Sequence, residues 1–162
     1  MPVVLRPISP EAAARLRAAL PPEDVVVAPD HPTEFSAGVA RQVGTGAPLG
    51  PFFLHRAQDD VVVGEIGGGF VAPRVVEIGY AIVPSCWGRG YATEAVRALV
   101  ARAREVFDIE QVIAHTPLDR PASGRVLEKA GFAFAGEEDD EHDGAPIRVR
   151  RWELHLRDGA AA

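Results

Sequence analysis

Residues 87–94 of the chain read Trp-Gly-Arg-Gly-Tyr-Ala-Thr-Glu. They follow an apolar run over 75–83 and the chain-breaking Pro84, and they lead into apolar residues at helical spacing over about 93–106. A strand, a glycine-rich turn and a helix in this order aim unpaired backbone N–H groups at one point, which is how many proteins hold phosphates. The stretch therefore predicts an anion site in front of a helix.

Three phosphate-binding turns compete for this stretch. A P-loop requires a Lys after its last Gly, and no Lys follows Gly90. A dinucleotide fingerprint requires a third Gly where Thr93 stands, and it belongs to the first βα unit, whereas this turn lies past mid-chain. A third pattern, with Gly or Ala two residues after a Gly, fits Gly90 and Ala92. The Gly-x-Gly pair alone would favour an ordinary left-handed turn into a helix.

Length and composition bound the possible classes of protein. The 162 residues, 47% apolar and 25% charged, suit one soluble domain over 1–158, with 159–162 as a frayed tail. The net charge of −6 argues against a general nucleic-acid binder. No apolar run is long enough for a membrane span, the first residues lack the pattern of a signal peptide, and the single Cys86 excludes an intramolecular disulfide. We therefore expect a cytoplasmic protein with neither a nucleic-acid nor a membrane partner.

The apolar patterns predict a mixed α/β domain. Ser9 is expected to cap the first helix, and Gly131 to end the last one. The strands are expected at 3–8, 51–56, 61–66, 75–83, 111–116, 132–136 and 147–156, and the helices at 10–20, 33–43, 93–106 and 122–130. The resulting order, β-α-α-β-β-β-α-β-α-β-β, indicates a mixed sheet with helices on both faces.

Three finer features complete this interpretation. Glycines 67–69 are expected to interrupt the chain between two strands, and a β-bulge near Arg150 and Arg151 would reconcile two alternation phases in the last strand. The acidic run over 137–143 is expected to be a solvated loop. The alternative is an electrostatic funnel for cationic acceptors, so neutralising these acids would then raise KM for a cationic substrate at low salt.

Two segments at a characteristic spacing resemble one family. The first runs from Glu77 through Tyr80 and Pro84 to Ala95, and the second is Ala-Ser-Gly-Arg-Val-Leu-Glu-Lys-Ala-Gly-Phe over 122–132. Together they resemble the GNAT superfamily of N-acetyltransferases, and in particular its ribosomal-protein N-terminal (Rim-type) branch. The resemblance implies the GNAT fold, with a central, mostly antiparallel twisted sheet, and direct transfer of acetyl from acetyl-CoA, without a metal, to a primary amine. It also implies a protein N-terminus or a small amine as acceptor, and a monomer or homodimer.

The resemblance also implies which residues hold the donor. The turn would bind the pyrophosphate through backbone amides, helped by the helix dipole. The strand before it would separate from the strand at 111–116, so that backbone groups of Ile82 and Val83 would meet the pantetheine arm and stabilise an oxyanion. Arg89 either adds charge or is simply solvated. The expected cofactor-binding residues are Ile82, Val83, Gly88, Arg89, Gly90, Tyr91, Ala92, Thr93 and Ser123.

Two residues are predicted to carry the chemistry. Removing a proton at pH 7 costs about 4.6 kcal/mol for a lysine side chain and about 1.4 kcal/mol for an α-amine, so an α-amine is the easier acceptor. Glu77 is the predicted base, directly or through water; a solvated or ion-paired strand Glu is the alternative. Ser123 would protonate the leaving thiolate or bind the cofactor; otherwise it satisfies a backbone N–H in its helix.

The chain departs from the family pattern at two positions. Arg120 stands where the branch carries an Asn that would cap a helix, and Asp119 is expected to take that role. Leu127 stands where many GNAT enzymes carry a Tyr that acts as general acid. An acyl-Cys86 intermediate is not expected, and His115 is expected to be a satisfied polar residue. The departures keep a second hypothesis open, in which the domain binds acyl-CoA as a sensor or scaffold without catalysis.

Overall fold

A computed structural model describes residues 2–142 and 144–157, so the predicted tail at 159–162 lies outside the described residues. The order of elements is the one predicted from the sequence, with one added 3-10 turn. The elements are β1 (Val3–Pro7), α1 (Pro10–Arg17), α2 (Ser36–Ala40), β2 (Leu49–Arg56), β3 (Val62–Ala72), β4 (Val75–Ile82), η1 (Pro84–Cys86), α3 (Tyr91–Arg104), β5 (Gln111–Pro117), α4 (Pro121–Lys129), β6 (Ala133–His142) and β7 (Ala145–His155).

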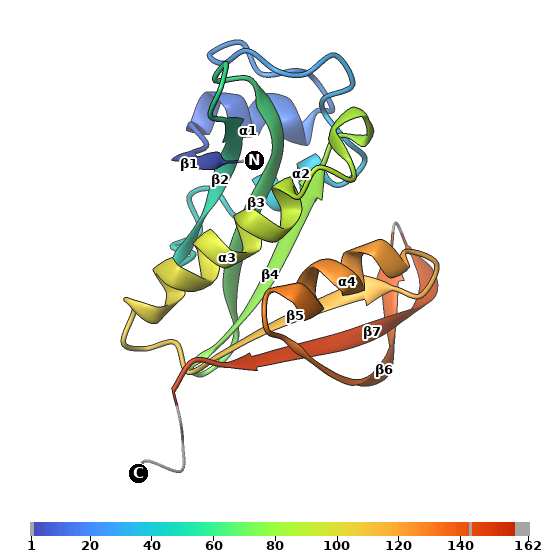
Figure 1. Cartoon of the computed structure of the whole chain (residues 1–162). Helices are drawn as coiled ribbons and strands as arrows, with labels where there is room; N and C mark the ends of the chain where they lie inside the picture. The colour runs from blue at the N-terminus through green and yellow to red at the C-terminus, as the bar shows by residue number, and fades with distance from the viewer. Residues whose placement is uncertain (1, 143, 158–162) are drawn as a thin grey trace.

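The strands form a seven-stranded sheet in the order β1-β2-β3-β4-β5-β7-β6. Every neighbouring pair is antiparallel except β4 with β5, which confirms the mostly antiparallel sheet. The parallel pairing is short: it begins with Val75 opposite Gln111 and ends with Glu77 opposite Ile113. Beyond that point the two strands diverge, as Figure 1 shows, so the sheet opens between the C-terminal halves of β4 and β5.

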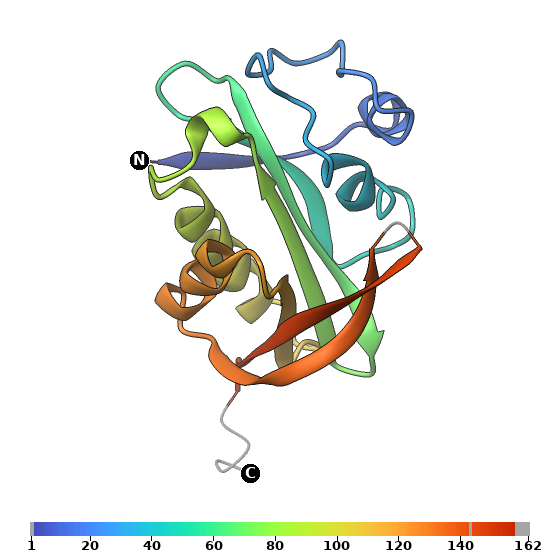
Figure 2. The ribbon, with the colours of Figure 1, turned by 90° about the vertical axis from the view of Figure 1, so that its right-hand side faces the viewer.

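Helices cover both faces of the sheet, as predicted (Figure 2). Helix α3 packs over β1–β4 and α4 over β5–β7, while α1 and α2 pair with each other on the opposite face. The larger core lies under α3 and α4, and a smaller one joins Leu16 of α1 to Phe53 and Val62. No helix in the described ranges is both long and apolar enough to cross a bilayer.

Both predicted helix ends have the expected chemistry. Ser9 Oγ accepts the Ala12 N–H at 3.0 Å and so caps α1. Gly131 has φ 100°, and the N–H of Phe132 reaches the Leu127 carbonyl at 3.0 Å, which closes α4 in a Schellman turn. The start of β6 is therefore fixed relative to α4.

The expected interruption at glycines 67–69 is wrong. Strand β3 continues through these residues to Ala72. Their lack of side chains serves packing instead. A Cβ placed on Gly68 would lie 2.8 Å from Val76 Cγ1 and 2.9 Å from Ile78 Cγ2, closer than a well-packed core allows.

The acidic run is not a loop either. Residues 137–142 belong to strand β6, and position 143 lies outside the described residues. Arg148 on β7 pairs with Asp139 at 2.9 Å and with Glu137 at 3.5 Å, so cross-strand pairs offset the repulsion between the acids. The bulge also lies elsewhere than predicted: Ala135 of β6 is the extra residue opposite Arg151 and Trp152, whereas β7 pairs with β5 without a shift.

Candidate functional site

The turn before α3 presents free backbone donors. Gly88 and Gly90 adopt left-handed φ values of 75° and 82°, and Gly90 is the N-cap of the helix without a side-chain cap. The first helical bond runs from the Glu94 N–H to the Gly90 carbonyl at 3.1 Å, so the N–H groups of the first turn have no backbone partner among the described residues. A Cβ on either glycine would meet no atom within 4 Å, which leaves the approach to these amides open. An anion fits this position.

The side chains of the turn have separate tasks. Tyr91 is 2% exposed and belongs to the core, so only its backbone faces the anion position. Trp87 donates its indole N–H to the Ile82 carbonyl at 2.7 Å and ties the turn to the end of β4. Arg89 is exposed, while Ala92 and Thr93 are half-buried in the first turn of the helix. The turn is thus a backbone cradle with one exposed cation, Arg89, beside it.

The end of β4 offers fewer free groups than expected. The Val83 N–H donates to the Val63 carbonyl at 2.9 Å and the Val83 carbonyl accepts the Cys86 N–H at 2.9 Å, so Val83 is engaged. Because neighbouring residues of a strand direct their backbone groups to opposite sides, those of Ile82 point away from β3, toward the opening. Its carbonyl is taken by Trp87. Of the backbone groups of Ile82 and Val83, the Ile82 N–H is therefore the one left facing the opening.

Tyr80 is a site residue that the sequence interpretation missed. Its hydroxyl donates to the Ser123 carbonyl at 2.9 Å, linking β4 to the first turn of α4 across the opening. Burial raises the pKa of the Tyr80 phenol well above its usual range, although the hydrogen bond to Ser123 acts in the other direction. The Ser123 hydroxyl has no hydrogen-bond partner within 2–142 and 144–157. The alternative role for Ser123, accepting a backbone N–H of its own helix, is therefore wrong. Alternation along β4 would have placed Tyr80 on the face opposite Glu77, which is the signal that could have identified it.

Glu77, His115 and Glu138 form a chain across three strands. His115 Nδ1 lies 2.9 Å from Glu77 Oε2, and its Nε2 lies 3.1 Å from Glu138 Oε2. Partial burial opposes the charged form of His115, but the hydrogen bonds and charges of Glu77 and then of Glu138 outweigh it and raise the pKa of the ring. The two carboxylates occupy opposite ring nitrogens, so they cannot converge on one metal ion. His115 is a satisfied polar residue, as predicted, and its partners could not be predicted from spacing alone.

Arg120 connects the α4 end of the site to the segment before α2. It donates to Glu34 Oε1 at 2.6 Å, and its guanidinium lies 4.9 Å from the centre of the Phe35 ring. Phe35 in turn stacks on His142 of β6 at 5.4 Å. Arg120 is the N-cap residue of α4, and no side chain caps this helix, so the expected capping by Asp119 is wrong. The Arg that departs from the family pattern therefore clamps the lead-in to α2 onto the second half of the sheet.

Two other positions are built in ways that remove them from the site. Leu127 is fully buried in α4 and supplies no acid. Cys86 is 4% exposed, with only weak contacts to Arg56 Nη1 at 3.8 Å and Ser85 Oγ at 3.9 Å. Its thiol is closed off from an incoming substrate.

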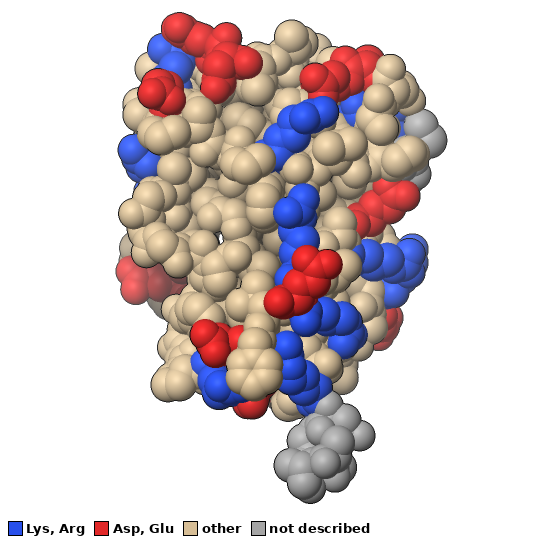
Figure 3. Space-filling view, turned by 90° about the vertical axis from the view of Figure 1, so that its left-hand side faces the viewer, with Lys and Arg blue, Asp and Glu red and all other residues tan. Residues whose placement is uncertain are grey.

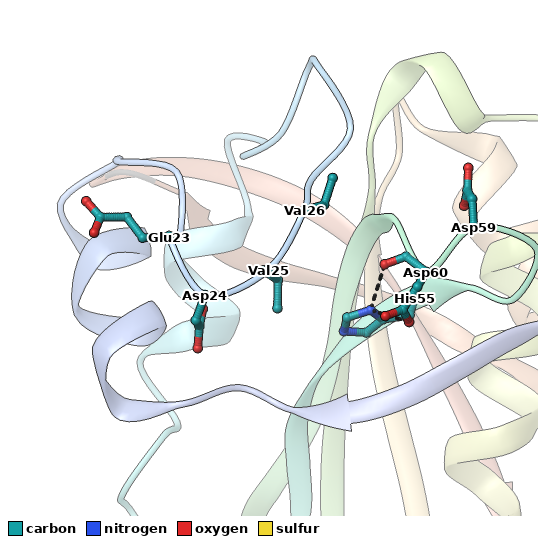
Figure 4. A pocket seen from close by; sticks show the side chains of 7 residues that line it. All are labelled: Glu23, Asp24, Val25, Val26, His55, Asp59 and Asp60. Carbon is teal, nitrogen blue, oxygen red and sulfur yellow. Dashed lines mark hydrogen bonds and ion pairs between the residues drawn. The ribbon is translucent and has the colours of Figure 1, made fainter.

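A surface cavity lies away from the opening, between the β2–β3 hairpin and the segment after α1 (Figure 4). It measures about 410 Å³, and its lining is mostly acidic: Glu23, Asp24, Val25, Val26, His55, Asp59 and Asp60. Its carboxylates already have partners, since Arg56 pairs with Asp59 at 2.8 Å and Ser9 donates to Asp24 at 2.7 Å. The cavity is an open surface hollow between paired charges.

The acidic excess is not spread evenly over the surface. Figure 3 shows Lys and Arg side chains in a column along one side of the molecule. Helix α3 itself carries two basic residues in its last turn, Arg102 and Arg104.

The chain matches known proteins over most of its length. The family model of the acetyltransferase (GNAT) domain matches residues 3–133. An uncharacterized N-acetyltransferase, YoaA of Bacillus subtilis (strain 168), is 32% identical over 85 residues, which cover 51% of this chain and 48% of that protein. The match thus spans about half the length of that relative.

Solved structures share the fold. The acetyltransferase (GNAT family) from Bacillus anthracis superposes with a TM-score of 0.62 at 21% identity, over 75% of this chain and 73% of that one. A chimera of the spermidine N-acetyltransferase SpeG from Vibrio cholerae with hSSAT gives a TM-score of 0.69 at 16% identity, over 95% of both chains. The family model covers residues 3–133, and the structure has a backbone cradle at α3 and an opening between β4 and β5. The chain belongs to the GNAT acetyltransferase family.

Proposed function

We propose that the protein is an N-acetyltransferase that moves an acetyl group from acetyl-CoA directly to a primary amine. The opening between β4 and β5 carries this proposal, because it joins the anion cradle to a carboxylate on the other face of the sheet. The pyrophosphate of acetyl-CoA would lie on the amides of the turn from Gly88 to Thr93, with Arg89 adding charge. The pantetheine arm would then enter the opening beside Ile82.

The reaction needs a base for the amine. Glu77 would take the proton from the acceptor, directly or through a water, and His115 would orient the carboxylate. The free amine then attacks the thioester carbon, the new C–N bond forms and the carbonyl oxygen becomes an oxyanion. The Ile82 N–H, which faces the opening and has no partner among the backbone bonds of the described residues, would stabilise that charge.

The leaving thiolate needs a proton. Ser123 is one donor, since its hydroxyl is uncommitted within the described part of the chain. Tyr80 is another, because its hydroxyl reaches the same turn of α4 and burial keeps it protonated. We assign the proton transfer to this pair, which meets where the Tyr80 hydroxyl reaches Ser123, one helical turn before Leu127. When the oxyanion collapses and the C–S bond breaks, the thiolate takes this proton and leaves as free CoA, and the proton that the new amide nitrogen loses restores the donor.

The acceptor is proposed to be an α-amine at a protein or peptide N-terminus, or a small amine of similar basicity. The two Rim-type segments support a protein N-terminus. The lower cost of deprotonating an α-amine, about 1.4 against about 4.6 kcal/mol for a lysine side chain at pH 7, supports the same choice.

The alternative is a domain that binds acyl-CoA without turnover, favoured by the Leu at position 127 and the Arg at position 120. Calorimetric titration with acetyl-CoA, combined with release of free thiol over a panel of amines, separates the two. Turnover on any amine supports the enzyme, and tight binding without turnover supports the sensor.

The base is tested by Glu77→Gln, with Glu105→Gln at the exposed end of α3 as the matched control. Loss of a general base lowers kcat by about 10²- to 10⁴-fold, while acetyl-CoA affinity stays unchanged. The outcome that would remove Glu77 from this role is a Glu77→Gln enzyme that keeps its full rate from about pH 6 to about pH 9. This range includes the ordinary pKa values of a His side chain and an α-amine.

A further inference from the structure

The face of the sheet below α2 carries a strip without side chains. Gly67 pairs in register with Gly79, and Gly69 pairs with Glu77. Because alternate residues of a strand face the same way, the three glycines and Glu77 share this face. A Cβ on Gly79 would meet no atom within 4 Å, so the space above it is open. We call Gly67, Gly69 and Gly79 the glycine strip.

Helix α2 turns the glycine strip into a slot. Gly38 and Val39 of α2, with Gln42 just after it, lie over Gly67 and Gly79 and enclose a cavity of about 110 Å³. This is several times the ~10–15 Å³ that one water needs and well below the ~300–1,000 Å³ of sites for drug-sized ligands. The slot suits a slender ligand rather than a bulky one.

One wall of the slot holds an unpaired acceptor. Gln42 Oε1 is buried without a hydrogen-bond partner in the described ranges, and it lies 3.2 Å from the position that a Cβ on Gly69 would take. Gly69 is the register partner of Glu77. An N–H donor bound between these residues would satisfy Gln42 and lie within reach of the Glu77 carboxylate.

The surrounding charges favour a cation. Glu77 is 37% exposed and Glu138 is 42% exposed, and they share His115. Arg151 also approaches Glu138, at 3.6 Å, but Glu153 holds its Nε at 2.7 Å. An arriving ammonium group would therefore meet accessible carboxylates before it loses its proton.

We propose that this slot binds the acceptor, and that it selects a primary amine on an unbranched or singly substituted small carbon. The amine N–H would donate to Gln42 Oε1, its carbon chain would lie on the glycine strip, and Glu77 would take its proton. This inference rests on the proposed acetyl transfer. The same chemistry is offered by a peptide that begins with Gly, Ala or Ser and by an unbranched alkylamine.

The test uses two graded sets of amines in the thiol-release assay. One set is a peptide of fixed sequence whose first residue is Ser, Ala, Val or Ile, and the other is butylamine with its isomer tert-butylamine, whose amine-bearing carbon is fully substituted. We expect the peptides that begin with Val or Ile, and the branched butylamine isomer, to have kcat/KM values about 10- to 200-fold lower than the unbranched members of their sets. This is the discrimination that one added methylene produces in a close-fitting pocket. The set with the higher kcat/KM identifies the source of the amine.

Two variants test the walls. Gly79→Val adds a side chain into open space on a strand, where Val is well tolerated, so it should keep the fold and fill the slot. It should raise KM for the amine by about 10- to 200-fold, with KM for acetyl-CoA unchanged. Gln42→Met keeps the length of the side chain but removes the acceptor, and it should raise KM for the amine as well. Ala72→Val, at the exposed end of β3, is the matched control and should change neither constant.

The outcomes separate the two proposals. Equal rates on branched and unbranched amines, with Gly79→Val unaffected, would overturn the slot and leave acetyl transfer intact. If no amine is acetylated, the proposed function fails, and the slot is tested by titrating butylamine into the protein with CoA present. Amide NMR shifts at Gly67 and Gly79 would then support the slot, and their absence would overturn it.

Discussion

His115 Nδ1 lies 2.9 Å from Glu77 Oε2, and the contact spans the point at which β4 and β5 part. Glu77 belongs to the last paired position of β4, whereas His115 lies two residues beyond the last paired position of β5. The side chains thus continue a connection that the backbones have ended. This relationship fixes the orientation of the proposed base at the mouth of the opening.

The pKa of His115 should fall when Glu138 is neutralised. In the wild-type protein partial burial lowers it, and the hydrogen bonds and charges of Glu77 and Glu138 raise it by more. Glu138→Gln removes one of the two raising carboxylates. NMR titration of the His115 ring protons measures the change. An unchanged pKa would show that the Glu138 carboxylate does not stabilise the charged form of the ring.

The interaction of His115 with Glu138 makes the stability of the protein depend on pH in a definite direction. Because the folded pKa of His115 lies above the unfolded value of 6.5, the contribution is complete below the unfolded pKa and disappears as pH rises through the folded pKa. Glu138→Gln should therefore destabilise the protein at the acidic end of that window and have less effect at the alkaline end. Urea unfolding on either side of the window is the measurement.

Gly90→Ala should weaken acetyl-CoA binding through the backbone. A Cβ at Gly90 would meet no neighbour, so its cost is the left-handed conformation, about 1–2 kcal/mol for a residue other than Gly. If the turn relaxes to avoid this cost, the amides of the cradle lose their alignment. Calorimetry should show a Kd for acetyl-CoA raised by about tenfold per 1.4 kcal/mol, whereas Gly44→Ala, at a similar φ of 81° in the segment after α2, should leave that Kd unchanged.

Tyr80→Phe should lower kcat, while its effect on the free energy of unfolding should be small. Loss of one neutral hydrogen bond, to the Ser123 carbonyl, costs about 0.5–1.5 kcal/mol of unfolding free energy. If Tyr80 and Ser123 share the proton transfer to the thiolate, the double variant with Ser123→Ala should lose more rate than either single variant. Full activity of the double variant would assign that proton to solvent.

Arg120→Ala should raise KM for the amine and leave acetyl-CoA affinity unchanged. The guanidinium holds Glu34 and the Phe35 ring, which precede α2 and hence the roof of the slot. Lys should not replace it, because an ammonium can neither stack flat on the ring nor present a planar fork. Arg125→Ala, on an exposed position of the same helix, is the control, and an equal effect of both variants would refute the clamp.

The sequence predicts most of the fold because the fold depends on local signals. The order of strands and helices, the Ser9 cap and the turn of Gly88 and Gly90 all follow from patterns a few residues long. The continuous strand through glycines 67–69 and the acidic strand do not follow from local patterns, because partners on other strands determine them, such as Val76 against Gly68 and Arg148 beside Asp139. Local propensity was overridden there by tertiary contacts.

The site divides in the same way. The cradle is continuous in sequence and could be recognised from it. The chain of Glu77, His115 and Glu138 depends on the register of β4, β5 and β6, and the Arg120 clamp joins residues that are 86 positions apart. No spacing rule in the sequence specifies such contacts.

The short parallel pairing of β4 with β5 also has a mechanical consequence. It is the seam between two sub-sheets, β1–β4 and β5–β7, and its backbone ladder ends at Glu77 and Ile113. A ligand that lies along β4 in this opening acts as a length of missing strand and completes the sheet. Occupancy by the donor would therefore stiffen the joint between the two halves, and the amides flanking it would exchange more slowly with solvent in the loaded protein.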